Sequence, residues 1–303
     1  MNFPMVSICC VTYNHFEYIK DCIEGFLMQK TNFEFEIIIH DDYSADGTLE
    51  ILLEYEKKYP KKFKLVLQNE NQWSKGVRGI FARFTFPMAK GKYIALCEGD
   101  DYWTDPLKLQ KQVDFLEENE EYAAVFHNSI ILNEVDNKTS LYRNEWDKNT
   151  EVSAEQIISG GGGIYPTVSI MFRANASRYF NELPEGFSGD TILSLSILLS
   201  GKFYYINEVM SVYRLHSRGV YSELVLNNNV SKLKNVWLSN INILIKYNDL
   251  SKGEYTHFVK SAIKKYYIRI LSMRKINVFR DFRYLIKIPI RDALYLLRKS
   301  LNL

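Results

Sequence analysis

The chain has 303 residues, of which 47% are hydrophobic and 24% are charged, and its formal net charge is +2. This composition is that of an ordinary globular protein, long enough for one large domain or for a domain with an appendage. We expect no membrane-spanning segment, because no apolar run in the sequence reaches the length needed to cross a bilayer. We also expect no signal peptide, because Met1–Met5 leads directly into a strand.

The first part of the chain alternates short apolar runs with amphipathic segments. We expect strands at Val6–Val11, Phe35–His40, Phe63–Gln68 and Ile94–Glu98, separated by helices at Glu17–Gln29, Leu49–Tyr59 and Ile80–Ala89. This alternation predicts an α/β fold with a mostly parallel central sheet and helices on both faces. Ligands of such sheets bind beyond the carboxyl ends of the strands.

The next part of the chain continues this pattern with longer connections. We expect a helix at Leu107–Asn119, a strand at Ala123–Leu132, a surface loop at Asn133–Thr150, a flexible loop at Gly160–Gly163, a strand at Val168–Phe172, a helix at Leu193–Ser200 and a last strand at Tyr204–Val212. His127 lies inside an apolar stretch, which favours a hydrogen-bonded core histidine over a ligand.

The character of the chain changes beyond Ser222. Helical patterns cover Leu224–Tyr247 and Glu254–Met273 and continue to the end, and Lys and Arg greatly outnumber Asp and Glu from Glu254 onward. Basic residues interleaved with aromatic and aliphatic ones suit an anionic membrane surface. They equally suit an appendage whose apolar stripe packs on the main domain. We expect no nucleic-acid binding, because no nucleic-acid module accompanies the charge.

The four cysteines are Cys9, Cys10, Cys22 and Cys97. They lie in apolar or helical contexts without the spacing of metal ligands. We therefore expect buried free thiols, as in a cytosolic protein.

Acidic residues follow the expected strands. Asp100 and Asp101 lie in the turn after the fourth strand, where successive side chains point to opposite sides and can hold different groups, such as a ribose and a metal ion. A site of few carboxylates suits Mg²⁺ or Mn²⁺. A solvated acidic turn is the alternative. Tyr13, Asp41 and Asp42 also lie at strand ends.

A nucleotide is the ligand that these strand ends suggest. Neither G-x-G-x-x-G nor G-x-x-x-x-G-K-[ST] follows the first strand, which argues against a dinucleotide oxidoreductase and a P-loop NTPase. Side chains would then hold the nucleotide: Asp41 or Asp42 can accept a hydrogen bond from a base, and Tyr13 can cover the face of the base. Turn and cap chemistry is the alternative for Asp41, Asp42 and Ser44.

Five segments in the same order resemble the family 2 glycosyltransferases with the GT-A fold. They are V-S-I-C-C-V-T-Y-N, I-I-I-H-D-D-Y-S-A-D-G-T, A-K-G-K-Y-I-A-L-C-E-G-D-D-Y-W, F-S-G-D-T-I-L and V-Y-R-L-H, which together extend from Val6 to His216. The resemblance implies a GT-A domain over residues 1–221, with a nucleotide-sugar-binding half (1–101) and an acceptor half (102–221), and a helical C-terminal extension over residues 222–303.

The resemblance also implies roles for individual residues. The positions that match nucleotide-sugar-binding residues are Thr12, Tyr13, Asn14, Asp41, Asp42 and Asp100. Asp101 matches the carboxylate that binds Mn²⁺ or Mg²⁺, and His216 matches a neighbour of the metal or diphosphate, with a surface loop as the alternative. Arg214 and Arg218 can contact phosphate. Lys75, Arg78 and Arg83 can do so too, or they are solvated charges.

Asp190 matches the general base of the family, which takes the proton of the acceptor hydroxyl. The alternative is a helix N-cap, because Asp190 directly precedes an expected helix. Burial near the acceptor would be needed to keep its carboxylate basic enough.

These expectations combine into one predicted activity. The chain is predicted to be a metal-dependent inverting glycosyltransferase that moves a sugar from a nucleotide-diphosphate sugar, a UDP-sugar first of all, to a glycan or lipid-linked acceptor in bacterial polysaccharide synthesis. We expect it in the cytoplasm, with a peripheral position on the inner face of the membrane as an extension. The alternatives are a non-catalytic, membrane-associated sugar-nucleotide-binding protein and a sugar nucleotidyltransferase.

Overall fold

A computed structural model describes residues 3–143, 145–186, 188–217, 230–272, 281, 283–284 and 286–293. Arg218, the expected helix start at Leu224 and much of the basic tail lie outside these residues.

The first part of the chain forms its elements in the expected order. They are β1 (Val6–Thr12), α1 (Ile19–Leu27), β2 (Phe35–Asp41), α2 (Thr48–Lys58), β3 (Phe63–Leu67), η1 (Phe81–Thr85), η2 (Phe86–Met88), β4 (Tyr93–Glu98) and β5 (Tyr102–Trp103). The α-helix expected at Ile80–Ala89 is wrong in type: η1 is a π-helical turn and η2 a 3₁₀ turn. Pro87 explains the break, because proline has no amide hydrogen to continue an α-helix.

The second part contains more secondary structure than expected. Its elements are α3 (Lys108–Glu118), β6 (Tyr122–Asn133), β7 (Lys138–Leu141), β8 (Thr150–Val152), α4 (Ala154–Gly160), η3 (Gly161–Gly163), η4 (Thr167–Ser169), β9 (Met171–Arg173), η5 (Ala174–Glu182), α5 (Gly189–Leu198) and β10 (Lys202–Leu215). The loop expected at Asn133–Thr150 contains β7, which pairs with the end of β6. Every residue of β7 is exposed, so its sequence lacks the apolar alternation that identifies a strand.

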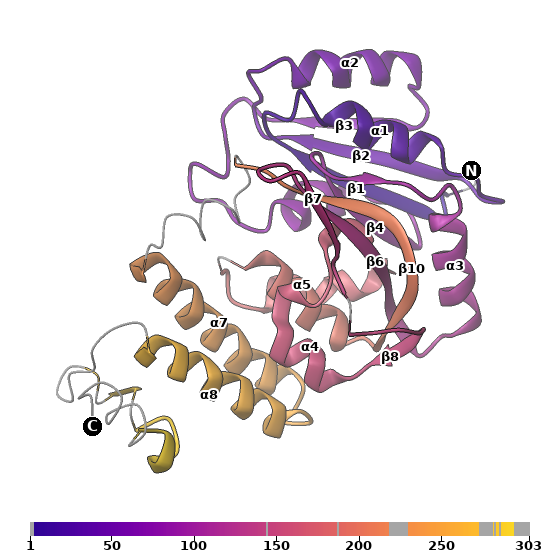
Figure 1. The fold of residues 1–303 in the computed structure, drawn as a ribbon. Coiled ribbons are helices and arrows are strands. Elements are labelled where there is room, and N and C mark those ends of the chain that lie inside the picture. Colours follow the sequence, from indigo (N-terminus) through magenta and orange to yellow (C-terminus); the bar gives the residue numbers. More distant parts are fainter. Residues whose placement is uncertain are drawn as a thin grey trace.

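The described strands form a single sheet of ten strands. This sheet crosses the domain (Figure 1). Its order is β3-β2-β1-β4-β9-β6-β10-β5, with β7 on β6 and β8 on β10. The strands β3, β2, β1 and β4 are parallel, as are β6 and β10, whereas β9 runs antiparallel to β4 and β6. The sheet is therefore parallel in its first half and mixed beyond β4.

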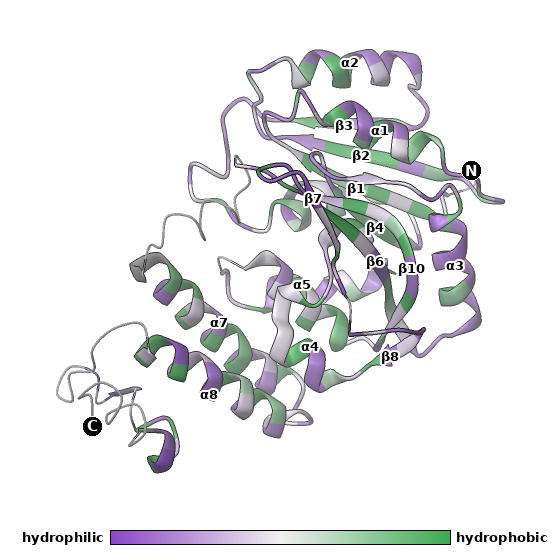
Figure 2. Cartoon of the chain, in the orientation of Figure 1, coloured by the Kyte–Doolittle hydropathy of each residue, from purple (hydrophilic) through white to green (hydrophobic). Residues whose placement is uncertain are grey.

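Two apolar layers cover the faces of the sheet, because successive side chains of a strand point to opposite sides. Ile8 and Cys10 pack with α1, α2 and α3, whereas Cys9 belongs to the layer that contains α4 and α5. The inner strands are correspondingly hydrophobic (Figure 2). All four cysteines are buried free thiols, so that expectation is confirmed.

The C-terminal region begins with two long helices, α7 (Val230–Leu250) and α8 (Thr256–Ser272). Ile243, Leu244 and Tyr247 of α7 and Val259 and Ala262 of α8 join the apolar layer of α4 and α5. Packing on the main domain, one of the two expectations for this region, is confirmed for these helices. Among the described residues, no helix is both long enough and apolar enough to cross a membrane.

Candidate active site

Three carboxylates gather where β4 ends at the edge of the sheet. Glu98, Asp100 and Asp101 each present an oxygen, and these oxygens lie within 4.8 Å of one another. The turn is tight because Gly99 faces Thr12: a Cβ at position 99 would lie 2.6 Å from Thr12 Oγ1. This spacing of carboxylate oxygens suits a divalent cation.

Asp101 is the most enclosed member of this acidic cluster (Glu98, Asp100 and Asp101). Its side chain is fully buried, and Oδ1 accepts a hydrogen bond from the backbone N–H of Arg214 at 2.8 Å. Oδ2 has no hydrogen-bond partner among the described residues. Burial, and then the charges of Asp100 and Glu98, raise the pKa of Asp101 well above its usual range. A buried carboxylate oxygen without a partner is costly unless a cation meets it, so the cluster fits a metal ion.

Asp100 is held by two histidines. Its Oδ2 lies 2.9 Å from His216 Nε2 and 3.7 Å from His15 Nε2. Burial acts to raise the pKa of Asp100, but the hydrogen bond with His216 and the proximity of His15 outweigh it, and the net pKa is lowered. His216 therefore lies at the acidic cluster, as expected for a neighbour of the metal or diphosphate, and not in a detached surface loop. Its role as a metal ligand stays a prediction.

Arg214 joins the acidic cluster to α1 rather than pointing at open space. Its guanidinium donates to the backbone oxygen of Asp100 at 2.7 Å and to Asp21 Oδ2 at 2.6 Å. The side chain is only 7% exposed. With these partners Arg214 acts as a brace for the turn that carries Asp100 and Asp101, a role that was not expected from the sequence. Its expected contact with phosphate stays a prediction.

The loops after β1 and β2 are tied together beside this cluster. Ser44 Oγ accepts from Asn14 N at 2.9 Å, and Asn14 Oδ1 accepts from Ala45 N at 2.9 Å. Asp41 accepts from both the N–H and the hydroxyl of Ser44, which is the turn chemistry considered as its alternative. Thr12 Oγ1, in contrast, is buried without a partner among the described residues.

The carboxylate of Asp42 is occupied by the loop that follows β3. Oδ1 accepts from Gln72 N at 2.8 Å and Oδ2 from Trp73 N at 3.0 Å. Each carboxylate oxygen has a second lone pair, so these bonds leave room for a base N–H. The nucleotide roles of Thr12, Tyr13, Asn14, Asp41 and Asp42 stay predictions, although the structure places all five at one edge.

Asp190 occupies the first turn of α5 but does not cap it. The N-cap is Ser188, and the Asp190 carboxylate makes no hydrogen bond within the described part of the chain. The side chain is accessible to solvent, yet protein atoms surround it closely, and this enclosure raises the pKa of Asp190 to about 6. Asp190 is therefore not the N-cap, although it lies in the first helical turn, where the helix dipole favours a carboxylate as expected. The role of general base stays a prediction.

The glycine run packs against the start of α5, which corrects the expected flexible loop. Gly160 ends α4 and Gly161–Gly163 form a 3₁₀ turn. A Cβ on Gly162 would lie 2.4 Å from the Cβ of Asp190, and Gly162 N donates to Thr191 Oγ1. Glycine is needed because the two backbones approach too closely for a side chain.

Asp190 interacts electrostatically with the acidic cluster. The negative charge of Asp190 contributes, after burial and Asp100, to raising the pKa of Glu98 well above its usual range. Electrostatic coupling of this kind requires the two carboxyl groups to be near each other. Asp190, although distant in sequence, therefore lies within electrostatic range of Glu98.

The three candidate cations before β4 have other partners. Lys75 pairs with Glu70 at 3.3 Å, Arg83 pairs with Glu185, and the Arg78 guanidinium lies 4.0 Å from the centre of the Trp73 ring. These contacts favour the expectation of surface charges for Lys75 and Arg83.

Sequence reasoning missed Glu98 and His15 as site residues. Glu98 is the first carboxylate of E-G-D-D and lies inside a recognised segment, whereas His15 directly follows the segment that ends at Asn14. Glu98 meets Asp100 within one turn, whereas His15 reaches Asp100 because β1 and β4 are adjacent in the sheet.

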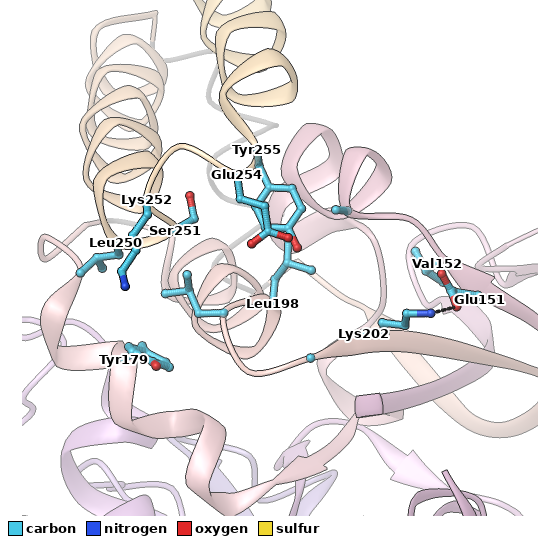
Figure 3. A pocket seen from close by; sticks show the side chains of 13 residues that line it. Glu151, Val152, Tyr179, Leu198, Lys202, Leu250, Ser251, Lys252, Glu254 and Tyr255 are labelled. Carbon is cyan, nitrogen blue, oxygen red and sulfur yellow. Dashed lines mark hydrogen bonds and ion pairs between the residues drawn. The ribbon is translucent and has the colours of Figure 1, made fainter. Parts of the chain in front are cut away.

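A cavity of about 510 Å³ lies elsewhere, at the far end of α5 (Figure 3). Its wall includes Leu198 and Leu199 of α5, Tyr179 of η5, and Lys252 and Glu254 from the turn between α7 and α8. None of the expected site residues lines it, so it is distinct from the acidic site.

The comparisons with known proteins agree with this geometry. The sequence model of Glycosyl transferase family 2 matches residues 7–180, more than half of the chain, so the chain belongs to glycosyl transferase family 2. An uncharacterized protein of Mycobacterium tuberculosis is 35% identical over 220 residues, which cover 71% of this chain and 60% of that protein. The putative teichuronic acid biosynthesis glycosyltransferase TuaG of Bacillus subtilis is 36% identical over 115 residues, or 38% of this chain and 43% of TuaG.

Solved structures confirm the expected GT-A fold. Residues 1–349 of S. aureus TarS superpose with a TM-score of 0.60 at 14% identity, covering 97% of this chain and 88% of that one. The mannosyltransferase PcManGT from Pyrobaculum calidifontis, in complex with GDP-Man and Mn²⁺, gives a TM-score of 0.57 at 14% identity, covering 99% and 86%. At this identity the likeness shows the fold alone.

Proposed function

We propose that the chain is a metal-dependent, inverting glycosyltransferase that moves a sugar from a nucleotide-diphosphate sugar to a hydroxyl group of a glycan or lipid-linked acceptor. The observation that carries this proposal is the cluster of three carboxylates after β4, in which the buried Oδ2 of Asp101 has no partner among the described residues. Asp190, whose pKa is raised to about 6, supports it because its charge also raises the pKa of Glu98. One part of the site can thus accept a proton while the other meets a diphosphate.

The acidic cluster would hold Mn²⁺ or Mg²⁺ through Asp101, with Glu98 and Asp100 at hand and His216 beside Asp100. A bound cation supplies neutralisation of the charge that grows on the leaving diphosphate. Arg214 fixes the turn that presents Asp101. We assign contacts with the ribose and the base to Thr12 and Asp42.

Asp190 acts on the acceptor. Its carboxylate takes the proton of the acceptor hydroxyl as that oxygen forms a bond to the anomeric carbon. The bond from this carbon to the diphosphate oxygen breaks, and the electron pair leaves with the nucleoside diphosphate. Attack from the side opposite to the leaving group inverts the anomeric centre.

The donor and pathway in this proposal come from relatives. TarS has been crystallised with UDP-GlcNAc and with UDP, and PcManGT with GDP-Man, which favours a nucleotide sugar and leaves a UDP-sugar as our first candidate. TuaG is described as a teichuronic acid biosynthesis enzyme, which favours a bacterial polysaccharide as the acceptor.

A peripheral position on the cytoplasmic face of a membrane is part of the same proposal. Packing on the main domain occupies apolar side chains of α7 and α8, but Lys260, Lys265 and Arg269 of α8 remain exposed. Sedimentation with vesicles of phosphatidylserine and phosphatidylcholine at low salt, compared with pure phosphatidylcholine, tests this contact. Equal recovery with both would refute it.

The experiment that tests the activity is a panel of UDP- and GDP-sugars incubated with the protein and Mn²⁺ or EDTA. Slow, Mn²⁺-dependent release of nucleoside diphosphate from one donor is expected, with water acting as the acceptor. Binding without release would favour a non-catalytic sugar-nucleotide-binding protein, and absence of binding would refute the proposal.

A further inference from the structure

Tyr43 has a backbone conformation that a bulky residue seldom adopts. Its φ is 70°, in the left-handed region that glycine tolerates and other residues avoid, because Cβ crowds the neighbouring carbonyl oxygen. The side chain is 54% exposed, so its burial offsets little of this strain. Something other than packing is needed to explain a tyrosine at this position.

The residues on both sides of Tyr43 force it into this conformation. On one side, Asp41 binds the N–H and the hydroxyl of Ser44. On the other, Asn71 Nδ2 donates to the backbone oxygen of Asp42 at 3.1 Å. Strain of this kind persists where the surroundings determine the backbone, and it is found preferentially at functional sites.

Tyr43 lies beside the loop that carries Tyr13. Because β1 pairs with β2 in a register that joins Thr12 to Asp41, the chain places Asn14 next to Tyr43, and Asn14 N bonds to Ser44 Oγ. Tyr13 is 46% exposed. Neither tyrosine ring stacks on another aromatic ring within the described residues, so both present faces to solvent at the nucleotide edge of the sheet.

We propose that Tyr43 is a second aromatic wall, together with Tyr13, for the planar base of the donor nucleotide. The strained turn holds the ring in place before the ligand arrives, which reduces the ordering cost of binding. This inference rests on the proposed function, and it assigns part of the affinity for the base to Tyr43, a residue outside the acidic cluster.

The test uses Tyr43→Gly and Tyr43→Phe in the full-length protein. Dissociation constants are measured by calorimetry for UDP, GDP and inorganic pyrophosphate, each with Mn²⁺, and the melting temperature is measured without ligand. Tyr43→Gly should weaken the tighter-binding nucleotide by about fivefold to a hundredfold, the range of base stacking. It should leave pyrophosphate within about twofold, because pyrophosphate has no base. Its melting temperature should rise by about 2 °C as strain is relieved.

Tyr43→Phe keeps both the ring and the strain, so affinity and melting temperature should stay close to those of the wild type. Unchanged nucleotide affinity in Tyr43→Gly, or an equal loss for pyrophosphate, would overturn the inference. A lower melting temperature in Tyr43→Gly would show that packing of the ring outweighs strain, and would overturn it as well. A wild-type protein that binds neither nucleotide would instead refute the proposed function itself.

Discussion

The titration of Asp190 gives the sharpest test of the proposed chemistry. Enclosure raises the pKa of Asp190 to about 6, whereas a freely solvated aspartate titrates near its ordinary value of 3.8. With a pKa of 6, about a tenth of the carboxylates are ionised at pH 5 and about nine tenths at pH 7. A reaction that needs the ionised base should therefore accelerate about tenfold between these two pH values.

The assay is release of nucleoside diphosphate from the active donor, at saturating donor and Mn²⁺ so that titration of the acidic cluster does not contribute. Asp190→Asn should lower kcat by about 10²- to 10⁴-fold and abolish the rise with pH. Glu185→Gln is a matched control, because Glu185 is an exposed carboxylate that pairs with Arg83. It should keep both the rate and the profile.

The same substitution has a readout in stability. Because the folded state raises the pKa of Asp190, its contribution to stability is present below pH 3.8 and is lost as the pH rises through about 6. The melting temperature of Asp190→Asn, minus that of the wild type, should therefore increase between pH 5 and pH 7. A wild-type rate that is flat over this range, or an Asp190→Asn variant with full turnover, would refute the assignment of Asp190 as the base.

Three further predictions follow from the site and the core. Asp101→Asn should weaken Mn²⁺ binding by at least about tenfold in calorimetry, whereas Asp105→Asn, outside the acidic cluster, should not; equal affinities would remove Asp101 from the metal site. Gly162→Ala should cost about 1–3 kcal/mol in urea unfolding and lower turnover, because its Cβ would lie 2.4 Å from that of Asp190. Gly163→Ala, which meets no atom within 4 Å, should be neutral, and similar losses in both variants would contradict this argument. All four thiols should resist a disulfide reagent in the native protein and react in denaturant, since all are buried; rapid labelling of the native state would show that the core opens.

Much of the fold could be predicted from local patterns. The buried runs Val6–Val11 and Phe35–His40 are apolar on both faces, as parallel strands require, and β1 and β2 follow them closely. Exposed β7 and the π-helical turn η1 could not be predicted in this way, because one lacks apolar alternation and the other is a distortion set by Pro87 and its neighbours.

The candidate site was predictable only in part. Asp100 and Asp101 are adjacent in sequence, so their chemistry was visible from residue types. The bond between Arg214 and Asp101 depends on the path of β10, which brings residues far apart in sequence together. The packing of Gly162 on Asp190 depends on the close approach of two backbone segments. Such contacts belong to tertiary structure, and no periodicity in the sequence encodes them.

The continuous sheet limits how this protein can move. The strands on either side of the turn that carries Asp100 and Asp101, β4 and β5, belong to the same sheet. Arg214, at the end of β10, bonds to this turn and to Asp21 of α1. Rotation of the first half of the sheet against the second would break the hydrogen bonds between neighbouring strands. Proteins that close by domain motion instead have hinges at a few connecting residues. We therefore expect any closing of the site over bound substrates to come from the loops along the edge of the sheet and not from rotation of its two halves.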